Sequence, residues 1–235
     1  MKLSKRLRQI DNMITQHYDH IWDCCCDHGQ LGKSLLQRQA ANTIHFVDIV
    51  EPLMTNLKIE LEDEFAEQTP NSIFQENWQV HCISAADISI KKAIDTTARN
   101  LLIISGVGGD LLIDLVHAIL RMHPNQELEF ILCPVYHNYK VRQALTDMGL
   151  GLINENLVKE KKHFYEIIHV STQANTAISK TGSIMWNFSR IEDKEYLKQC
   201  IAHYQRTSKN KPSSNALLDY QKLNIRLPKQ PHSSL

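Results

Sequence analysis

Two carboxylates and a histidine stand in the loop after the first apolar run of this 235-residue chain. Residues 21–31 read Ile-Trp-Asp-Cys-Cys-Cys-Asp-His-Gly-Gln-Leu, which predicts a strand, a tight loop and the start of a helix. Doubly wound folds bind nucleotide-like ligands at such a turn. Asp23 and Asp27 would repel a pyrophosphate and attract a cation. The loop therefore favours S-adenosylmethionine, which has an adenosine, an ammonium and no phosphate, over a dinucleotide.

The same loop supplies two further candidate cofactor contacts, His28 and Gly29. Gly29 would give the backbone room beside the ligand, while the acids meet the ligand ammonium directly or through water. A plainer interpretation of Asp27 is that it caps the following helix, because Asp is a favoured capping residue. Both roles are compatible.

Small and acidic residues follow the next two predicted strands. Asp48 lies about 20 residues beyond the loop, where doubly wound folds place the acid that accepts from ribose hydroxyls. Ile49 follows it directly. Asp87 could accept from an adenine amino group while the small Ala86 leaves room for the ring. These four residues extend the predicted cofactor site, although an Asp at a strand end is also common in turns.

A glycine-rich loop, Ser105-Gly106-Val107-Gly108-Gly109, lies between a buried strand and a helix. One glycine would suffice for a turn with positive φ, so three favour close approach by a ligand or a substrate base. Tyr136 follows the fifth predicted strand and could stack on that base, although a single Tyr more often packs internally.

Metal chemistry has little support in the sequence. His28 and His137 could bind a metal ion, but no third ligand follows at a fixed spacing, so we expect no metal site. Cys24, Cys25 and Cys26 would alternate between faces of a strand and could not converge on one ion. We expect them to be reduced thiols that pack as small hydrophobic side chains.

Composition indicates a globular protein with uneven charge. The chain carries 26 basic and 26 acidic residues and is 43% hydrophobic, but residues 1–10 hold four basic residues and no acid. From residue 180 onward ten Lys or Arg face four Asp or Glu, a surplus of six. Basic ends suit contact with a polyanion, or they are ordinary soluble tails. Apolar runs are too short for a bilayer or a signal peptide, so we expect a cytoplasmic protein with no membrane partner.

Five alternations of strand and helix predict an α/β, Rossmann-like fold with a mostly parallel seven-stranded sheet and an antiparallel last strand, typical of class I methyltransferases. An amphipathic helix over residues 3–16 precedes it, with Lys5, Arg6 and Arg8 beside the apolar stripe. We expect residues 1–172 to form this domain and residues 173–235 a helical, basic, partly flexible extension. The expected strands span 20–25, 43–48, 78–83, 101–104, 128–133, 151–158 and 164–171, and the expected helices 30–39, 53–65, 90–97, 110–122, 139–148 and 191–207.

These features together resemble the bacterial tRNA adenine-N(1) methyltransferases that act on adenine 22, the TrmK-like family. The resemblance covers about residues 3–172 and rests on residues 3–7, the Asp23–His28 loop, Asp48, and the segments 105–109 and 164–168. It implies a class I fold, S-adenosylmethionine as the methyl donor, and RNA methylation. The chain departs from the family at Cys25, which replaces a loop glycine, at Val107, which replaces Met, and at 134–136, where Pro-Asn is usual.

The expected activity is methylation of ring nitrogen 1 of an adenine in tRNA, with tRNA as the partner. The base would be extruded into the crevice, as enzymes acting on bases do. No obligatory general base is visible in the sequence, and Asp27 and Asp110 are weak candidates for one. Alternatives are methylation of another RNA, a protein or a small molecule, and a non-catalytic S-adenosylmethionine or RNA-binding module. The residues assigned are Gly106, Gly108, Gly109 and Tyr136 for catalysis, and Lys5, Arg6 and Arg8 for RNA.

Overall fold

A seven-stranded sheet forms the centre of the computed structural model, which describes residues 3–65, 77–90, 98–208 and 215–225. The strand order is β3-β2-β1-β4-β5-β7-β6. The first five strands are parallel, and β7 lies antiparallel between β5 and β6. The sheet predicted from the sequence is therefore confirmed. The strands are β1 (Tyr18–Cys24), β2 (Ala41–Asp48), β3 (Trp78–Cys82), β4 (Asn100–Ser105), β5 (Leu128–Cys133), β6 (Gly151–Glu160) and β7 (His163–Ser171).

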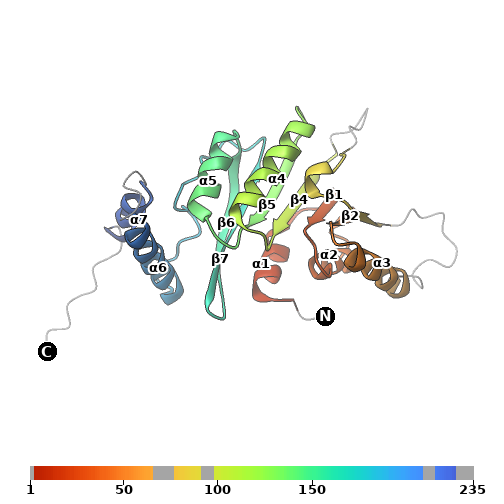
Figure 1. Ribbon diagram of the computed structural model, residues 1–235, viewed down its shortest axis with the longest axis horizontal. Helices are drawn as coiled ribbons and strands as arrows, with labels where there is room; N and C mark the ends of the chain where they lie inside the picture. The colour runs from red at the N-terminus through yellow and green to blue at the C-terminus, as the bar shows by residue number, and fades with distance from the viewer. Residues whose placement is uncertain (1–2, 66–76, 91–97, 209–214, 226–235) are drawn as a thin grey trace.

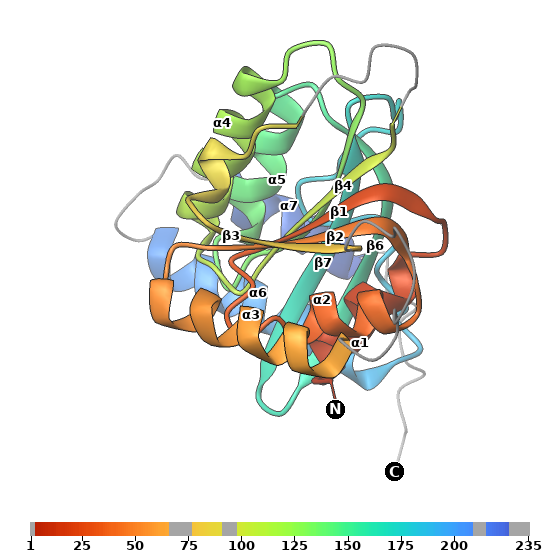
Figure 2. The ribbon, with the colours of Figure 1, turned by 90° about the vertical axis from the view of Figure 1, so that its right-hand side faces the viewer.

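Helices cover both faces of the sheet, as Figures 1 and 2 show. One face packs against α1 (Lys5–Met13), α2 (Gln30–Gln37) and α3 (Glu51–Phe65), and the other against α4 (Gly109–Met122), α5 (Asn138–Asp147) and the 3₁₀ turn η2 (Ala85–Asp87). Each layer has its own apolar core. The central strand β4 is buried along almost its whole length, as expected between two helical layers.

The expected helix at residues 90–97 falls largely outside the described residues, as do residues 209–214 and 226–235 of the extension that was expected to be partly flexible. The other predicted helices are present, with ends shifted by a few residues. None of the helices in the described part of the chain combines the length and the apolar character needed to cross a membrane.

The C-terminal extension contains two packed helices, α6 (Ile191–Ser208) and α7 (Ala216–Ile225), and only the first was expected. Ten residues with little amphipathic character give a weak helical pattern, so α7 depends on packing for its stability. Its Ala216 and Tyr220 are buried in a third apolar cluster with Tyr139 of α5 and Tyr196 of α6.

A buried ion network fastens this extension to the sheet. Arg142 of α5 is fully buried, and its guanidinium contacts Glu166 of β7 and Glu155 of β6, each at 2.6 Å. The hydroxyl of Tyr196 donates to the second Glu166 oxygen at 2.6 Å. Burial is the largest effect and disfavours the charge on Glu155, but Arg142 and the hydrogen bonds from Ser183 together keep the pKa of Glu155 below its usual value. The second Glu155 oxygen accepts backbone N–H groups of residues 184 and 185.

We predict that Arg142→Met lowers the free energy of unfolding by about 3–5 kcal/mol, because two buried carboxylates lose their cation. Lys58→Met is the matched control, since Lys58 forms an exposed pair with Glu62 at 3.8 Å on α3. Loss of that pair should cost no more than about 0.5 kcal/mol. Chemical denaturation of both variants measures the difference, and equal effects would contradict the role given to Arg142.

Candidate functional site

The predicted site residues gather because the first five strands end at one edge of the sheet. Cys24 at the end of β1 is paired with Val47 of β2 on one side and with Ile104 of β4 on the other. Ser105 at the end of β4 is paired with Cys133 of β5. The loops that carry chemistry therefore leave neighbouring strands side by side.

Asp23 anchors the turn from β1 into α2. Its side chain is buried, and its Oδ2 accepts the backbone N–H of Gly32 at 2.9 Å. A Cβ at Gly32 would stand 2.2 Å from the Phe46 ring, so glycine lets α2 lie close to β2. Burial raises the pKa of Asp23 to about 7; the Gly32 N–H opposes this rise, and the charge of Asp48 adds to it.

The loop after β1 alternates in and out of the left-handed region, with φ of 57° at Cys25, 52° at Asp27 and 62° at Gly29. It is tied to β2 by the Asp27 N–H, which donates to Asp48 Oδ2 at 3.1 Å. Only glycine adopts this conformation without steric cost, which for Cys25 is of the order of 1–2 kcal/mol. The residue that replaces the family's glycine thus occupies a strained position.

The three adjacent cysteines are free, but they do not share one environment. Cys24 is buried in the apolar core, as expected, whereas Cys25 and Cys26 are half-buried and line a cavity. Burial raises the pKa of Cys25 to about 11, so this thiol is a poor nucleophile near neutral pH.

A cavity of about 340 Å³ opens between the β1 loop, the β4 loop and α1. The β1 loop contributes Asp23, Asp27 and His28, and the β4 loop contributes Ser105 and Gly106. Asp27 and His28 are exposed, and the distance from Asp27 Oδ1 to His28 Nε2 is 3.6 Å. Two acids at one side of a small cavity make that side attractive to a cation.

Helix α1 supplies the opposite charge, which the sequence did not indicate. Arg6 lines the cavity, and its Nη1 lies 3.3 Å from where a Cβ on Gly106 would stand. Its guanidinium also lies 5.2 Å from the centre of the Tyr165 ring. Lys5 and Arg8 are exposed instead. The three predicted RNA-binding residues therefore do not form one surface, because the packing of α1 turns Arg6 inward.

Ser4 and Leu7 also line this cavity, together with Gln30 and Leu31 of α2, and sequence patterns did not identify any of them. The Ser4 hydroxyl accepts the Leu7 N–H and caps α1. A cap before an amphipathic helix is visible in the sequence, but which face of the sheet the helix covers is not.

The remaining predicted cofactor residues follow β2 and β3, next to the cavity along the same edge. Asp48 is half-buried, and Ile49 is 70% exposed. Ala86 is half-buried in η2, where the Ser84 hydroxyl accepts its N–H, and Asp87 is exposed. None of these four residues lines the 340 Å³ cavity, but the hydrogen bond from the Asp27 N–H links Asp48 to the cavity loop.

The double glycine of the β4 loop makes room for Tyr136. A Cβ at Gly108 would stand 2.3 Å from the Tyr136 hydroxyl oxygen, and one at Gly109 would stand 2.6 Å from the Tyr136 carbonyl oxygen. The sequence suggested that these glycines admit a ligand or a base. Here they admit the loop after β5, and Tyr136 itself remains 54% exposed.

Asp110, at the start of α4, is bonded to two basic side chains. Lys140 Nζ donates to its Oδ1 at 2.6 Å, and His137 Nδ1 lies 3.0 Å from its Oδ2. The Lys140 hydrogen bond is the main cause that lowers the pKa of Asp110. A carboxylate stabilised in this way is a weak proton acceptor. No group of three or more His, Cys, Asp or Glu side chains arranged to hold a metal ion occurs within the described residues.

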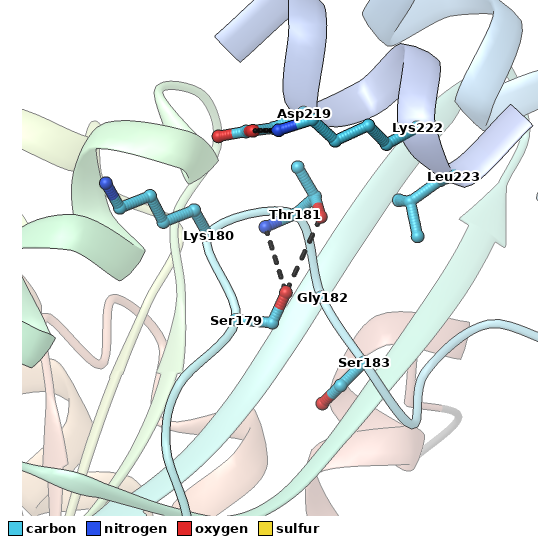
Figure 3. Close-up of a pocket in the computed structure, with 8 residues that line it drawn as sticks. All are labelled: Ser179, Lys180, Thr181, Gly182, Ser183, Asp219, Lys222 and Leu223. Atoms are coloured by element: carbon cyan, nitrogen blue, oxygen red, sulfur yellow. Dashed lines mark hydrogen bonds and ion pairs between the residues drawn. The ribbon is translucent and has the colours of Figure 1, made fainter. Parts of the chain in front are cut away.

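A separate cavity of about 530 Å³ lies in the extension, between residues 179–183 and α7 (Figure 3). Lys180 and Lys222 line it, but Lys222 is paired with Asp219 at 3.1 Å. It holds none of the predicted site residues.

Comparisons with known proteins identify the family and the fold. The family model described as a methyltransferase domain matches residues 3–168. No curated protein matches the chain.

Solved structures share the fold at low sequence identity. The chain is similar to Bacillus subtilis TrmK, an m1A22 tRNA methyltransferase, with a TM-score of 0.69, 20% identity, and coverage of 96% of this chain and 95% of that one. It is similar to Mycoplasma capricolum TrmK in complex with S-adenosylhomocysteine, with a TM-score of 0.70, 17% identity and 95% coverage of both chains. For the magnesium protoporphyrin IX methyltransferase of Synechocystis the TM-score is 0.53 and the identity 13%, with 71% of this chain and 79% of that one covered.

Asp23 should make stability depend on pH. With a pKa of about 7 when folded and 3.8 ordinarily, it keeps its proton in the folded chain while the unfolded chain releases it. The contribution of protonated Asp23 to the free energy of unfolding is therefore complete below pH 3.8. It decreases as the pH rises and is lost once the pH has passed 7. Asp23→Asn should gain stability relative to wild type between pH 5 and 8, with a ceiling on the order of 4 kcal/mol. Chemical denaturation at both pH values measures this. Asp63→Asn, at an exposed position, is the control, and a constant difference for Asp23→Asn would refute the assignment.

Cys25→Gly should raise the free energy of unfolding by up to about 1 kcal/mol, because glycine removes the left-handed strain but adds entropy to the unfolded chain. Lys161→Gly is the matched control, with φ of 55° at an exposed turn residue that does not line the cavity. Equal gains in chemical denaturation would identify backbone strain as the cause. A loss confined to Cys25→Gly would instead mean that packing of its sulfur outweighs the strain.

Proposed function

The chain belongs to the methyltransferase-domain family, and from that membership we propose that it transfers a methyl group from S-adenosylmethionine to ring nitrogen 1 of an adenine in tRNA. One observation carries the choice of cofactor: Asp23, Asp27 and Arg6 line the same small cavity. The amino-acid end of S-adenosylmethionine has an ammonium for the acids and a carboxylate for the guanidinium. A pyrophosphate would meet two carboxylates there.

Arg6 is thus proposed as a cofactor contact, binding the carboxylate of the ligand. An Arg fork matches carboxylate geometry, and the hydrogen bonds are strengthened by charge. Lys5 and Arg8, which are exposed on α1, remain the proposed RNA contacts.

The adenosine end of the cofactor would extend along the sheet edge past β2 and β3. Asp48 is proposed to accept from the ribose hydroxyls, and Asp87 from the adenine amino group. The exposed Ile49 and the small Ala86 offer an apolar surface to the adenine ring. The complex of Mycoplasma capricolum TrmK with S-adenosylhomocysteine supports a related ligand in this fold.

When bound, S-adenosylmethionine supplies a methyl group on a positively charged sulfur. Ring nitrogen 1 of neutral adenine has a free electron pair and no proton, so the N–C bond forms as the S–C bond breaks and the positive charge passes to the base. No general base is required, which agrees with the paired state of Asp110. The proposed task of Gly106 and Tyr136 is to hold the base in line with the methyl group, because alignment supplies much of the rate, and Gly108 and Gly109 make the room that Tyr136 needs for it.

The proposal of tRNA as substrate is supported by two structures of TrmK, the protein from Bacillus subtilis being an m1A22 tRNA methyltransferase. Both match 95% or more of this chain, so the likeness includes the C-terminal extension and extends beyond the methyltransferase core. With such a substrate the protein would act in the cytoplasm.

A nucleoside profile of tRNA incubated with the protein and S-adenosylmethionine tests this function, with 1-methyladenosine as the expected product. Methylation of another nucleoside, or of protein only, would replace the proposed acceptor. Calorimetry that detects no S-adenosylmethionine binding at millimolar ligand would leave a non-catalytic binding module.

Substitutions of two arginines on α1 test cofactor binding and RNA binding separately. We predict that Arg6→Gln weakens S-adenosylmethionine binding about tenfold to a hundredfold, since it loses charge-assisted hydrogen bonds, and leaves RNA affinity nearly unchanged. Arg8→Gln, the same change two residues away, should instead reduce RNA affinity and lower the salt dependence by about one phosphate contact. Calorimetry and fluorescence anisotropy measure the two affinities. If Arg6→Gln instead weakens RNA binding and leaves S-adenosylmethionine binding unchanged, Arg6 is an RNA contact and not a cofactor contact.

A further inference from the structure

A second groove lies beside the glycine loop, at the junction between the sheet and the extension. It has a volume of about 540 Å³, within the range of small-molecule sites. Tyr136 and His137 of the β5–α5 loop form one wall, and His203, Tyr204 and Arg206 of α6 form the other. Figure 1 shows α6 next to α5 at this end of the molecule.

The charge of this groove is opposite to that of the acidic loop in the cofactor cavity. None of the described residues that line it is an acid, while Arg206 is a permanent cation. Arg206 is exposed in the last turn of α6. The groove therefore suits an anionic occupant at Arg206, because no carboxylate lines the groove and His137, the other basic side chain near it, is already paired with Asp110.

Aromatic rings form much of the groove surface. The Tyr204 and Tyr220 rings are stacked, with centres 5.6 Å apart and an angle of 17° between their planes. His203 meets Tyr204 edge-on at 4.9 Å, and His137 meets Tyr136 edge-on at 4.7 Å. Such surfaces bind nucleobases, since every base has a π face, and a nearby cation can bind the phosphate.

Tyr136 connects the groove to the reaction site. Its hydroxyl oxygen lies against Gly108, while its 54% exposed ring lines the groove. A nucleotide in the groove would therefore be separated from the glycine loop by a single side chain. That is the position of a residue next to an extruded target base in the same RNA strand.

We propose that this groove binds an unstacked nucleotide that flanks the target adenine, with its base on the tyrosine and histidine rings and its phosphate at Arg206. This inference rests on the proposed function, because it requires an RNA substrate. It also gives the extension a part in substrate selection: the extension completes a binding site that the sheet domain alone cannot form.

Two variants of α6 test the groove. Arg206→Gln removes the cation, and Lys198→Gln is its control, because Lys198 is exposed on the same helix but does not line the groove. Ala202→Trp fills the groove from an exposed position, and Ala202→Ser keeps it open. Anisotropy with unfractionated tRNA and with a short single-stranded RNA measures affinity, and calorimetry with S-adenosylmethionine checks that the cofactor cavity is intact.

We expect Ala202→Trp to weaken binding of both RNA probes at least about fivefold, as the loss of one stacked base would. Arg206→Gln should weaken it by a similar factor and reduce the salt slope by about one. Both controls should bind as wild type, and all four variants should bind S-adenosylmethionine normally. If Arg206→Gln and Ala202→Trp both bind RNA with wild-type affinity, the groove does not bind a nucleotide and the proposal is wrong. This conclusion does not depend on what the wild-type protein methylates. If the wild type binds RNA through the groove but forms no methylated nucleoside, the groove stands and the proposed reaction fails.

Discussion

A buried carboxylate with a backbone N–H partner holds the functional edge of this protein together. Asp23 ends β1 inside the fold, and its hydrogen bond from Gly32 fixes the first turn of α2 against the sheet. The loop between them is tied to β2 through the Asp27 N–H and Asp48. Because these contacts share one short segment, the acids of the cavity are positioned by the same bonds that close the βα turn. The same contacts therefore serve both ligand binding and folding. The pKa of about 7 for Asp23 reflects the cost of burying a charged carboxylate at this position.

The second constraint acts at the opposite end of the sheet. Arg142 joins α5 to β6 and β7, and Tyr196 and the backbone near residue 184 complete the network from the extension. A buried ion group of this kind is weak evidence for net stability, because desolvation offsets much of its attraction. Its geometric effect is clearer. It fixes α6 beside the β5–α5 loop, and the aromatic groove exists only where these two elements meet.

The two cavities differ in charge in the way that the two proposed ligands differ. The smaller one opposes two acids to one arginine, which suits a zwitterionic amino acid. The larger one has basic and aromatic side chains and no acid among its described lining, which suits a nucleotide. Tyr136 lines the larger cavity and packs against Gly108 of the glycine loop, where a side chain on Gly108 would exclude it. The glycine loop thus places an exposed aromatic ring next to the proposed reaction site.

The sequence by itself determined the order of strands and helices, the parallel sheet with its reversed strand, and the candidate acids at the strand ends. Local patterns carry this information, since hydrophobic periodicity and turn residues act over a few positions. Three features could not be predicted from the sequence. They are helix α7, whose stability comes from packing, the inward direction of Arg6, and the packing of Tyr136 against Gly108. Each of these depends on contacts between residues far apart in the chain: Arg6 meets Gly106, and Tyr136 meets Gly108. Tertiary structure decided them, because only the packed sheet brings α1, the β4 loop and the extension to the same edge.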